Sequence, residues 1–260
     1  MLLEIFVCLI AGIGAGVGTG FAGISAATVI SPLLIVLLDI PAYQAVGIAL
    51  ASDVLASAVS ARTYAKSKNI DIKSGSVMLI SVLAMTAFGS VIASHMPNMT
   101  MGYFSTLITA GMGINFLIHP NMKTREEMAQ KSRKRKLMES LGCGIYIGFV
   151  CGFVGAGGGL MMLFVLTTVL GYEQKTAVGT SVFVMTFTAF TGATSHFLIG
   201  VIPNYSVLIL CIIFTFIAAR ISAIFANKAK PSTLNRITGL ILAGIGISMT
   251  ILRLMTHLNV

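Results

Sequence analysis

Ten apolar runs, most of them long enough to cross a bilayer as helices, constrain the fold of this chain more than any other feature. They cover residues 2–19, 24–38, 44–62, 75–94, 101–118, 138–154, 159–170, 176–199, 205–225 and 234–254. A bilayer core about 30 Å thick needs about 20 apolar residues per helix, and its backbone polar groups must be paired internally. With 56% hydrophobic and only 10% charged residues, the sequence predicts an all-α integral membrane protein, a polytopic helical bundle of about 8 to 10 membrane segments.

Charge and cysteine content exclude several other classes. The net charge of +9 comes from short loops between apolar runs, so we attribute it to membrane topology and expect no nucleic-acid partner. The first run starts at Met1 without a preceding basic segment, and we expect it to be a helix of the protein rather than a removable signal peptide. The cysteines fall within apolar runs at no metal-ligand spacing, so we expect no disulfide framework, no metal and no cofactor.

The chain contains an internal repeat. Its longest polar stretch, residues 123–136, separates five apolar runs from five. "AVG" at 45–47 recurs at 177–179, an offset of 132 residues, and the same offset pairs Gly12, Gly16, Gly20, Phe21 and Gly23 with Gly144, Gly148, Gly152, Phe153 and Gly155. We therefore predict a first membrane repeat over 1–120, a basic cytoplasmic linker over 121–137 and a second membrane repeat over 138–260, together forming one transmembrane domain.

The distribution of basic residues predicts how the halves are oriented. If each half crosses the membrane an odd number of times, the second half is inverted, and every Lys and Arg except Arg253 then lies in the cytoplasm with the linker. A parallel arrangement would place Lys175 and the basic group 220–236 outside, and would need a merged first helix about 50 Å long. We therefore predict two inverted repeats with both termini outside, as a multi-pass protein of the inner (cytoplasmic) membrane. Inverted repeats are typical of secondary transporters.

Two runs, 24–38 and 159–170, are too short to span the bilayer, and each follows a glycine-rich stretch. We expect each repeat to contain a short broken or re-entrant helix pair plus three spanning helices. Free N–H groups at two facing half-helix starts would form an anion site near the midplane. Close helix packing explains Gly12, Gly16 and Gly20 better, whereas the dense run 155–159 favours a broken helix.

The predicted anion site draws residues from both halves. Ser25, Thr180 and Ser181 carry hydroxyl groups that suit N-capping and anion contact equally. His196 titrates near neutral pH, although a packing histidine explains it somewhat better. The full predicted set of substrate-binding residues is Gly20, Gly23, Ser25, Gly155, Gly157, Gly158, Gly159, Thr180, Ser181 and His196.

The two glycine-rich segments resemble a known family. "GFAGISAATVISPLLIVLLDIPAYQAVGIA" and "GFVGAGGGLMMLFVLTTVLGYEQKTAVGTS", with "GATSHFLIGVI" at 192–202, are similar to the pattern of the sulfite exporter TauE/SafE family, over nearly the whole chain. The resemblance implies transport of small sulfur-containing or organic anions, such as sulfite or sulfonates, across the bacterial cytoplasmic membrane. In the first half "SAATVIS" replaces much of the glycine run, and Asp53 stands where that pattern has a small or apolar residue.

Asp53 is the acidic residue deepest within a predicted crossing. A buried carboxylate costs several kcal/mol in a bilayer unless it is paired, protonated or hydrated. Two roles stay open: coupling of transport to protons or ions, and a protonated carboxyl that hydrogen-bonds a neighbouring helix. We assign the coupling role to Asp53 as a hypothesis.

The function predicted from these features is secondary transport of a small anion by alternating access, with export as the expected direction. An anion channel of the same architecture is the main alternative, although it would need a continuous polar path. We do not expect an enzyme, because neither His-Glu-x-x-His nor Gly-x-Ser-x-Gly occurs. The expected partners are the anion and the lipid bilayer, while proton coupling and a homodimer are left open.

Overall fold

The computed structural model describes residues 2–93, 133–154, 158–199, 204–230, 233, 234, 236–241 and 244. Within these residues every regular element is a helix, which confirms the predicted all-α membrane class. Four helices there are long and apolar enough to cross a membrane, over Leu2–Ala22, Gln44–Lys66, Gln174–Thr194 and Tyr205–Lys228. Three shorter apolar helices cover Ala27–Leu38, Ile72–Thr86 and Leu137–Phe149.

The helices follow the apolar runs. The elements are α1 (Leu2–Ala22), α2 (Ala27–Leu38), α3 (Ala42–Lys66), α4 (Ile72–Ala93), α7 (Arg133–Val154), α8 (Gly158–Phe164), η1 (Val165–Val169), α9 (Gln174–Ile199) and α10 (Tyr205–Lys228). The run 159–170 becomes α8 followed by η1, a π-helical turn. The run 101–118 and most of 234–254 lie outside the described residues. Helix α7 begins at Arg133, within the predicted linker, so the end of that basic stretch is helical.

Side chains in the loops set several helix boundaries. The Asn204 side chain accepts hydrogen bonds from the N–H groups of Ser206 and Val207 at the start of α10. Asp71 caps α4 in the same way, with its Oδ1 accepting from Ser74 N at 3.1 Å. Each cap satisfies donors that the first helical turn leaves unpaired. At the other end of α2, Asp39 adopts the left-handed conformation (φ 50°), which ends that helix before Pro41.

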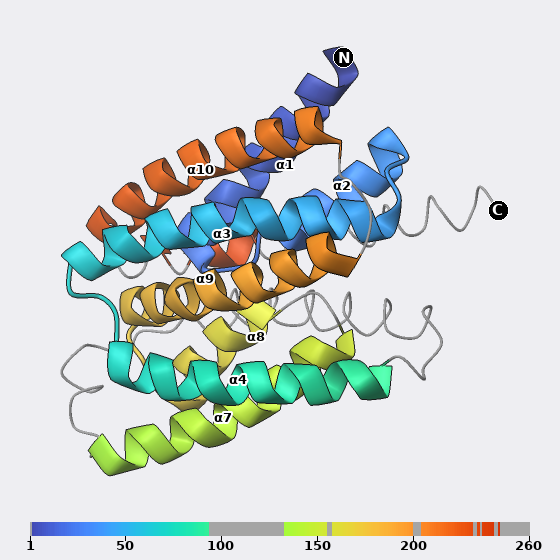
Figure 1. Cartoon of the computed structure of the whole chain (residues 1–260). Helices are drawn as coiled ribbons and strands as arrows, with labels where there is room; N and C mark the ends of the chain where they lie inside the picture. The colour runs from blue at the N-terminus through green and yellow to red at the C-terminus, as the bar shows by residue number, and fades with distance from the viewer. Residues whose placement is uncertain are drawn as a thin grey trace.

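Helix α1 packs along α10, and glycines make the approach close (Figure 1). A Cβ atom on Gly12 would lie 2.6 Å from Phe214 Cβ, and one on Gly16 would lie 2.7 Å from Ala218 Cβ. Gly20 on α1 faces Ser222 on α10. The packing interpretation of this glycine series is therefore confirmed, because each position brings the α1 backbone against α10.

Helices α7 and α4 form a matching pair. A Cβ atom on Gly148 would lie 2.5 Å from Val82 O and 2.9 Å from Met85 Cβ, and Gly144 faces Ser81 and Met78. Gly144 and Gly148 are the repeat equivalents of Gly12 and Gly16. Helix α1 runs parallel to α10, and α7 runs parallel to α4. Each pair therefore joins a helix of the first half to a helix of the second.

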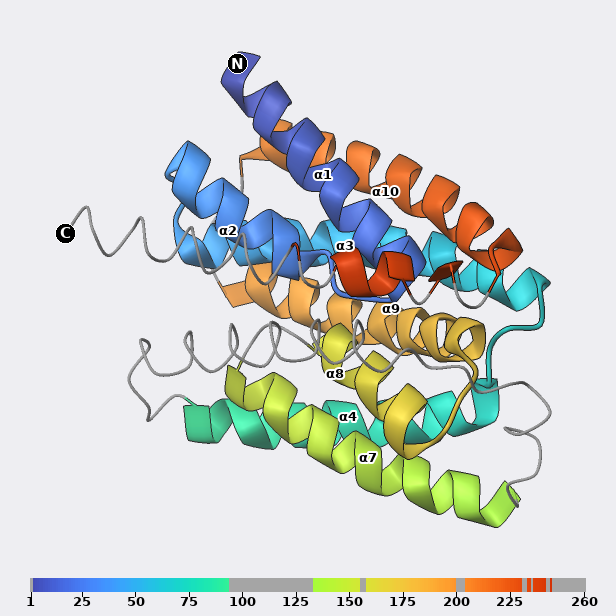
Figure 2. The same cartoon turned by 180° about the vertical axis from the view of Figure 1, so that it is seen from behind.

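Helices α3 and α9 lie between these two pairs and run antiparallel (Figures 1 and 2). Their crossing brings Gly192 to Leu50 near one end and Gly179 to Tyr64 near the other. At the second end, Asn69 Nδ2 donates to Asn227 Oδ1 at 2.8 Å, and Lys175 Nζ donates to Asn227 O at 2.8 Å. The α3–α4 loop, the start of α9 and the end of α10 therefore share one end of the bundle, which we call the basic end.

Candidate functional site between two interrupted helices

The first interruption separates α1 from α2. Helix α1 ends at Ala22, and Gly23 takes φ +62°, a left-handed conformation that favours glycine. Thr19 Oγ1 donates to Ile24 O at 2.9 Å, which holds the turn against the end of α1. Helix α2 then starts at Ala27, so the predicted break in the first half is confirmed and lies at residues 23–26.

The second interruption meets the first one directly. Gly159, in the first turn of α8, is buried, and a Cβ atom there would lie 2.8 Å from Ser25 N and 2.9 Å from Gly23 O. Only a residue without a side chain lets the backbones approach so closely. Three of the predicted site residues, one from the second half and two from the first, are therefore in contact.

Helix α9 contributes a hydroxyl group to this contact. Ser181 Oγ lies 2.8 Å from Gly23 O and 3.5 Å from Gly159 O, so it links both interruptions. The Met185 sulfur, one turn further along α9, lies 3.6 Å from Ser181 Oγ. A Cβ atom on Gly159 would lie 2.6 Å from that sulfur.

Helix α3 contributes Asp53 from the opposite side of residues 23–25. Ser25 Oγ donates to Asp53 Oδ2 at 2.6 Å, a short hydrogen bond of the kind made to carboxylates. The Asp53 side chain is only 1% exposed, and its Oδ1 has no hydrogen-bond partner among the described residues. The predicted coupling residue and the predicted anion-binding serine thus contact each other.

The N–H groups at the start of α2 are engaged, which differs from the expectation of free donors. Ala27 N donates to Ser25 Oγ at 3.3 Å. Thr28 N donates to Ser25 O at 3.1 Å. The physical reason is that Ser25 accepts from the first turn of α2, while its own hydroxyl proton is donated to Asp53.

The remaining predicted site residues lie elsewhere or outside the described part. Gly20 packs on α10, and its carbonyl oxygen accepts from Tyr64 OH at 2.8 Å. Thr180 Oγ1 accepts from Asp71 N at 3.1 Å at the basic end, away from the contact of the two interruptions. Gly158 is the first residue of α8. Gly155, Gly157 and the side chain of His196 lie outside the described residues.

Met185 is the site residue that sequence reasoning missed. An offset of 132 residues pairs it with Asp53, so the repeat itself carried the signal. A methionine in an apolar helix gives no chemical signal of its own, because it is more often a packing residue. Within the described residues, no group of His, Cys, Asp or Glu side chains is placed to hold a metal ion.

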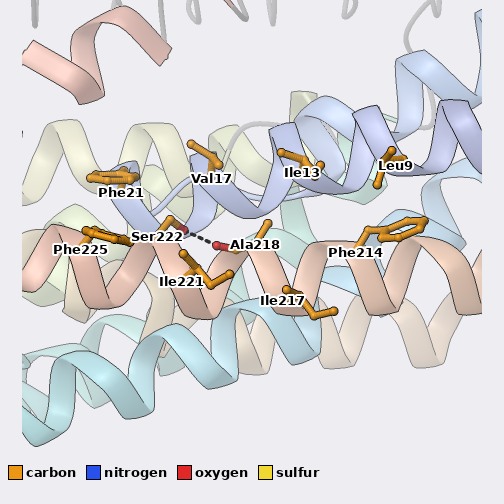
Figure 3. Close-up of a pocket in the computed structure, with 10 residues that line it drawn as sticks. All are labelled: Leu9, Ile13, Val17, Phe21, Phe214, Ile217, Ala218, Ile221, Ser222 and Phe225. Atoms are coloured by element: carbon orange, nitrogen blue, oxygen red, sulfur yellow. Dashed lines mark hydrogen bonds between the residues drawn. The ribbon is translucent and has the colours of Figure 1, made fainter.

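A cavity of about 420 Å³ lies between α1 and α10, away from this contact (Figure 3). Its lining is apolar, with Ile13, Ile217 and Phe225 among the side chains drawn. Ser222 is its polar residue, and the Ser222 hydroxyl lies within hydrogen-bond distance of Gly16 O and Ala218 O. The cavity therefore presents no free donor, and its chemistry suits hydrocarbon rather than an anion.

Interrupted helices that meet inside a membrane bundle are typical of membrane transporters. Comparison with known proteins supports this class and gives the family: the chain belongs to the sulfite exporter TauE/SafE family, whose model matches residues 8–249. It is 24% identical over 264 residues to the probable membrane transporter protein YunE of Bacillus subtilis (strain 168), covering 94% of this chain and 96% of that protein. It is 26% identical over 216 residues to the probable membrane transporter protein YdhB of the same organism, covering 82% of this chain and 86% of that protein.

No solved structure matches the chain significantly. The family and the names of the two relatives indicate a membrane transporter rather than an enzyme. The protein is thus a multi-pass membrane transporter.

Proposed function

We propose that this protein carries a small sulfur-containing or organic anion, such as sulfite or a sulfonate, across the cytoplasmic membrane by alternating access. The transporter is a secondary one, and it exports the anion when the anion is concentrated in the cytoplasm. The family description names a sulfite exporter, which supports the substrate class. Coupling to protons is assigned to Asp53.

The observation that carries this proposal is the contact of Gly23 and Ser25 with Gly159. Ser181 adds a hydrogen bond to Gly23 O at this contact. The contact brings backbone polar groups, two serine hydroxyls and a carboxyl group together inside the bundle. Irregular backbone within a membrane protein is tolerated where it is buried in protein or lines a cavity, and transporters place substrate sites at such points. Moving one interruption away from the other would expose these groups to an anion.

The alternating mechanism follows from treating the halves as inverted repeats. The pairs α1–α10 and α7–α4 use equivalent glycines, and α3 crosses α9 antiparallel between them, as a two-fold axis in the membrane plane would require. Rocking of one half against the other about this axis would open the contact to each side in turn. The shared basic end supports a cytoplasmic location for the loops around Lys68, Lys175 and Lys228.

An anion channel is the competing function. The hydroxyls of Ser25 and Ser181 are engaged with Asp53 Oδ2 and Gly23 O, and the backbones meet too closely at Gly159 for an open path there. A channel requires a continuous polar pathway in one conformation. The closed contact therefore favours a carrier.

Flux into sealed proteoliposomes tests the proposal. We expect labelled sulfite or a sulfonate to enter or leave vesicles that contain the protein, and the flux to respond to an imposed proton gradient. Gly159→Val should abolish this flux while the protein still inserts, because the added side chain collides with Ser25, Gly23 and Met185. Gly142→Val is the matched control, since a Cβ atom at Gly142 meets nothing within 4 Å. Normal flux through a folded Gly159→Val variant would place the substrate path elsewhere.

A further inference from the structure

The Asp53 carboxyl group occupies the place where the start of α2 would hold an anion. Its Oδ2 accepts from Ser25 Oγ at 2.6 Å, and Ser25 Oγ in turn accepts from Ala27 N, at the start of α2, at 3.3 Å. Helix α2 has 12 residues, so its first turn carries the positive end of a helix dipole. A carboxylate and a sulfonate are both small oxyanions that accept hydrogen bonds from the same donors.

The second carboxyl oxygen of Asp53 has no hydrogen bond to offset its burial. Asp53 Oδ1 is fully enclosed and has no hydrogen-bond partner in the part of the chain that the structure describes, although the residue is 99% buried. An ionised carboxylate left in this condition inside a membrane is costly, and the cost disappears when it binds a proton or a cation.

No described cation neutralises Asp53. On α3 itself, Arg62 and Lys66 are exposed toward the basic end, and Tyr64 OH donates to Gly20 O. The other charged or titratable groups with described side chains on the helices packed against α3 are Glu4 and Cys8 on α1, Lys175 on α9, and Tyr205, Cys211, Arg220 and Lys228 on α10. His196 also lies on α9, and its side chain is outside the described part. Among the described residues, the hydrogen-bond partner of the Asp53 carboxyl group is Ser25.

The repeat breaks its symmetry at this position. Met185, which the offset of 132 residues pairs with Asp53, lies beside Gly159 and Ser181 in the second half. A thioether neither ionises nor competes strongly for hydrogen-bond donors. The two halves therefore place an ionisable group beside the first interruption and a neutral group beside the second.

We propose that Asp53 is a built-in competitor of the substrate anion at the start of α2, so that the anion binds there only together with a proton on Asp53. Protonation releases the Ser25 hydroxyl to the anion, and the new Asp53 O–H can itself donate to it. Because Met185 cannot take up a proton, the position equivalent to Asp53 in the second half contributes no coupling. This inference rests on the proposed anion transport and adds its coupling chemistry: one proton is bound with each anion, so an inward proton gradient favours uptake and opposes export.

Binding of methanesulfonate to the purified full-length protein tests the inference, since this probe keeps one negative charge from about pH 5 to about pH 8. We expect wild-type affinity to weaken about tenfold for each pH unit once Asp53 is ionised, as linkage to one proton requires. Asp53→Asn should bind at all these pH values with nearly constant Kd. Asp39→Asn, at the exposed opposite end of α2, is the matched control and should keep the wild-type pH dependence.

A second measurement needs no variant. Adding methanesulfonate to wild-type protein in weak buffer above neutral pH should remove about one proton from solution for each anion bound. Three results would overturn this inference while leaving the proposed function intact: a Kd of Asp53→Asn that depends on pH, a wild-type Kd that does not, or binding that depends on sodium rather than protons. Failure of wild type to bind or transport sulfite and sulfonates at any pH would instead contradict the proposed function, and the inference with it.

Discussion

The Ser181 hydroxyl on α9 lies 2.8 Å from the carbonyl oxygen of Gly23, the residue at which α1 turns toward α2. This hydrogen bond joins the second half of the chain to the interruption of the first. A serine hydroxyl has a single proton, so the Ser181 proton cannot be donated to an anion while it is donated to Gly23. In the proposed mechanism, Ser181 can donate to the substrate only after its hydrogen bond to Gly23 is broken.

Ser181→Ala should destabilise the protein by about 1 to 3 kcal/mol, because it leaves the buried Gly23 carbonyl without its hydroxyl donor. It should also lower anion flux. The control is Thr186→Ala, since Thr186 Oγ1 only bonds Val182 O within the same helix, at 2.8 Å. Thermal unfolding in detergent and vesicle flux measure the two effects. Equal results for the two variants would argue against a link between the halves at Ser181.

Gly16→Ala should destabilise the α1–α10 contact by about 1 to 3 kcal/mol, the usual cost of overpacking. The added methyl group would meet Thr215 O at 2.5 Å and Ala219 N at 2.7 Å. Gly142→Ala, on an open face of α7, should be neutral or should stabilise its helix by about 0.5 to 1 kcal/mol. Unfolding by denaturant or heat compares the two, and a stable Gly16→Ala variant would show that α1 and α10 are not closely packed.

The burial of Tyr172 predicts that the folded protein loses stability in alkaline solution. Its side chain lies in the loop before α9, fully buried, and its hydroxyl donates to Asp71 Oδ2 at 2.8 Å. Burial, chiefly, raises the pKa of Tyr172 above its ordinary value. The folded state therefore favours the neutral phenol, whose contribution is complete below about pH 10 and is lost as the pH rises further.

Tyr172→Phe should accordingly be less stable than wild type at neutral pH and should lose less stability above about pH 10. Tyr205→Phe is the control, because Tyr205 is 62% exposed at the start of α10. Thermal unfolding midpoints measured across the alkaline range check this prediction. Parallel pH profiles for wild type and Tyr172→Phe would contradict it.

Membrane topology predicts which loops face the same side. In a background without the native cysteines, Ser67→Cys and Asn204→Cys should react with an impermeant thiol reagent from opposite sides, because both residues are exposed at opposite ends of the bundle. Lys228→Cys should label from the same side as Ser67→Cys, since Asn69 and Asn227 are hydrogen-bonded at the basic end. Labelling of Ser67→Cys and Asn204→Cys from one side would exclude the inverted arrangement.

Much of the fold could be predicted from sequence because few backbone structures can span a bilayer. The runs 44–62 and 205–225 became α3 and α10, which extend beyond the apolar residues because loop and polar end residues continue the helix. The offset of 132 residues pairs Gly23 with Gly155, which lies outside the described residues. The observed contact is between Gly23 and Gly159, in the first turn of α8.

The partners of individual polar side chains could not be predicted, because they depend on how separate helices meet. Sequence spacing does not predict that Ser25 bonds Asp53. Nor does it predict that Thr180 bonds Asp71 while its neighbour Ser181 bonds Gly23. Adjacent residues on a helix point about 100° apart, so Thr180 and Ser181 serve different contacts. The free N–H groups expected at the start of α2 were also inferred without knowing that Asp53 lies there.

Counterflow in proteoliposomes tests the central claim of an alternating-access anion carrier most directly. Vesicles are loaded with a high concentration of unlabelled sulfite, diluted into a trace of labelled sulfite, and followed with the membrane potential clamped. A carrier whose site faces one side at a time should accumulate label transiently above its equilibrium level, and Gly159→Val should abolish the overshoot while Gly142→Val retains it. Label that enters without any overshoot, at a rate independent of internal sulfite, would contradict alternating access and indicate a channel.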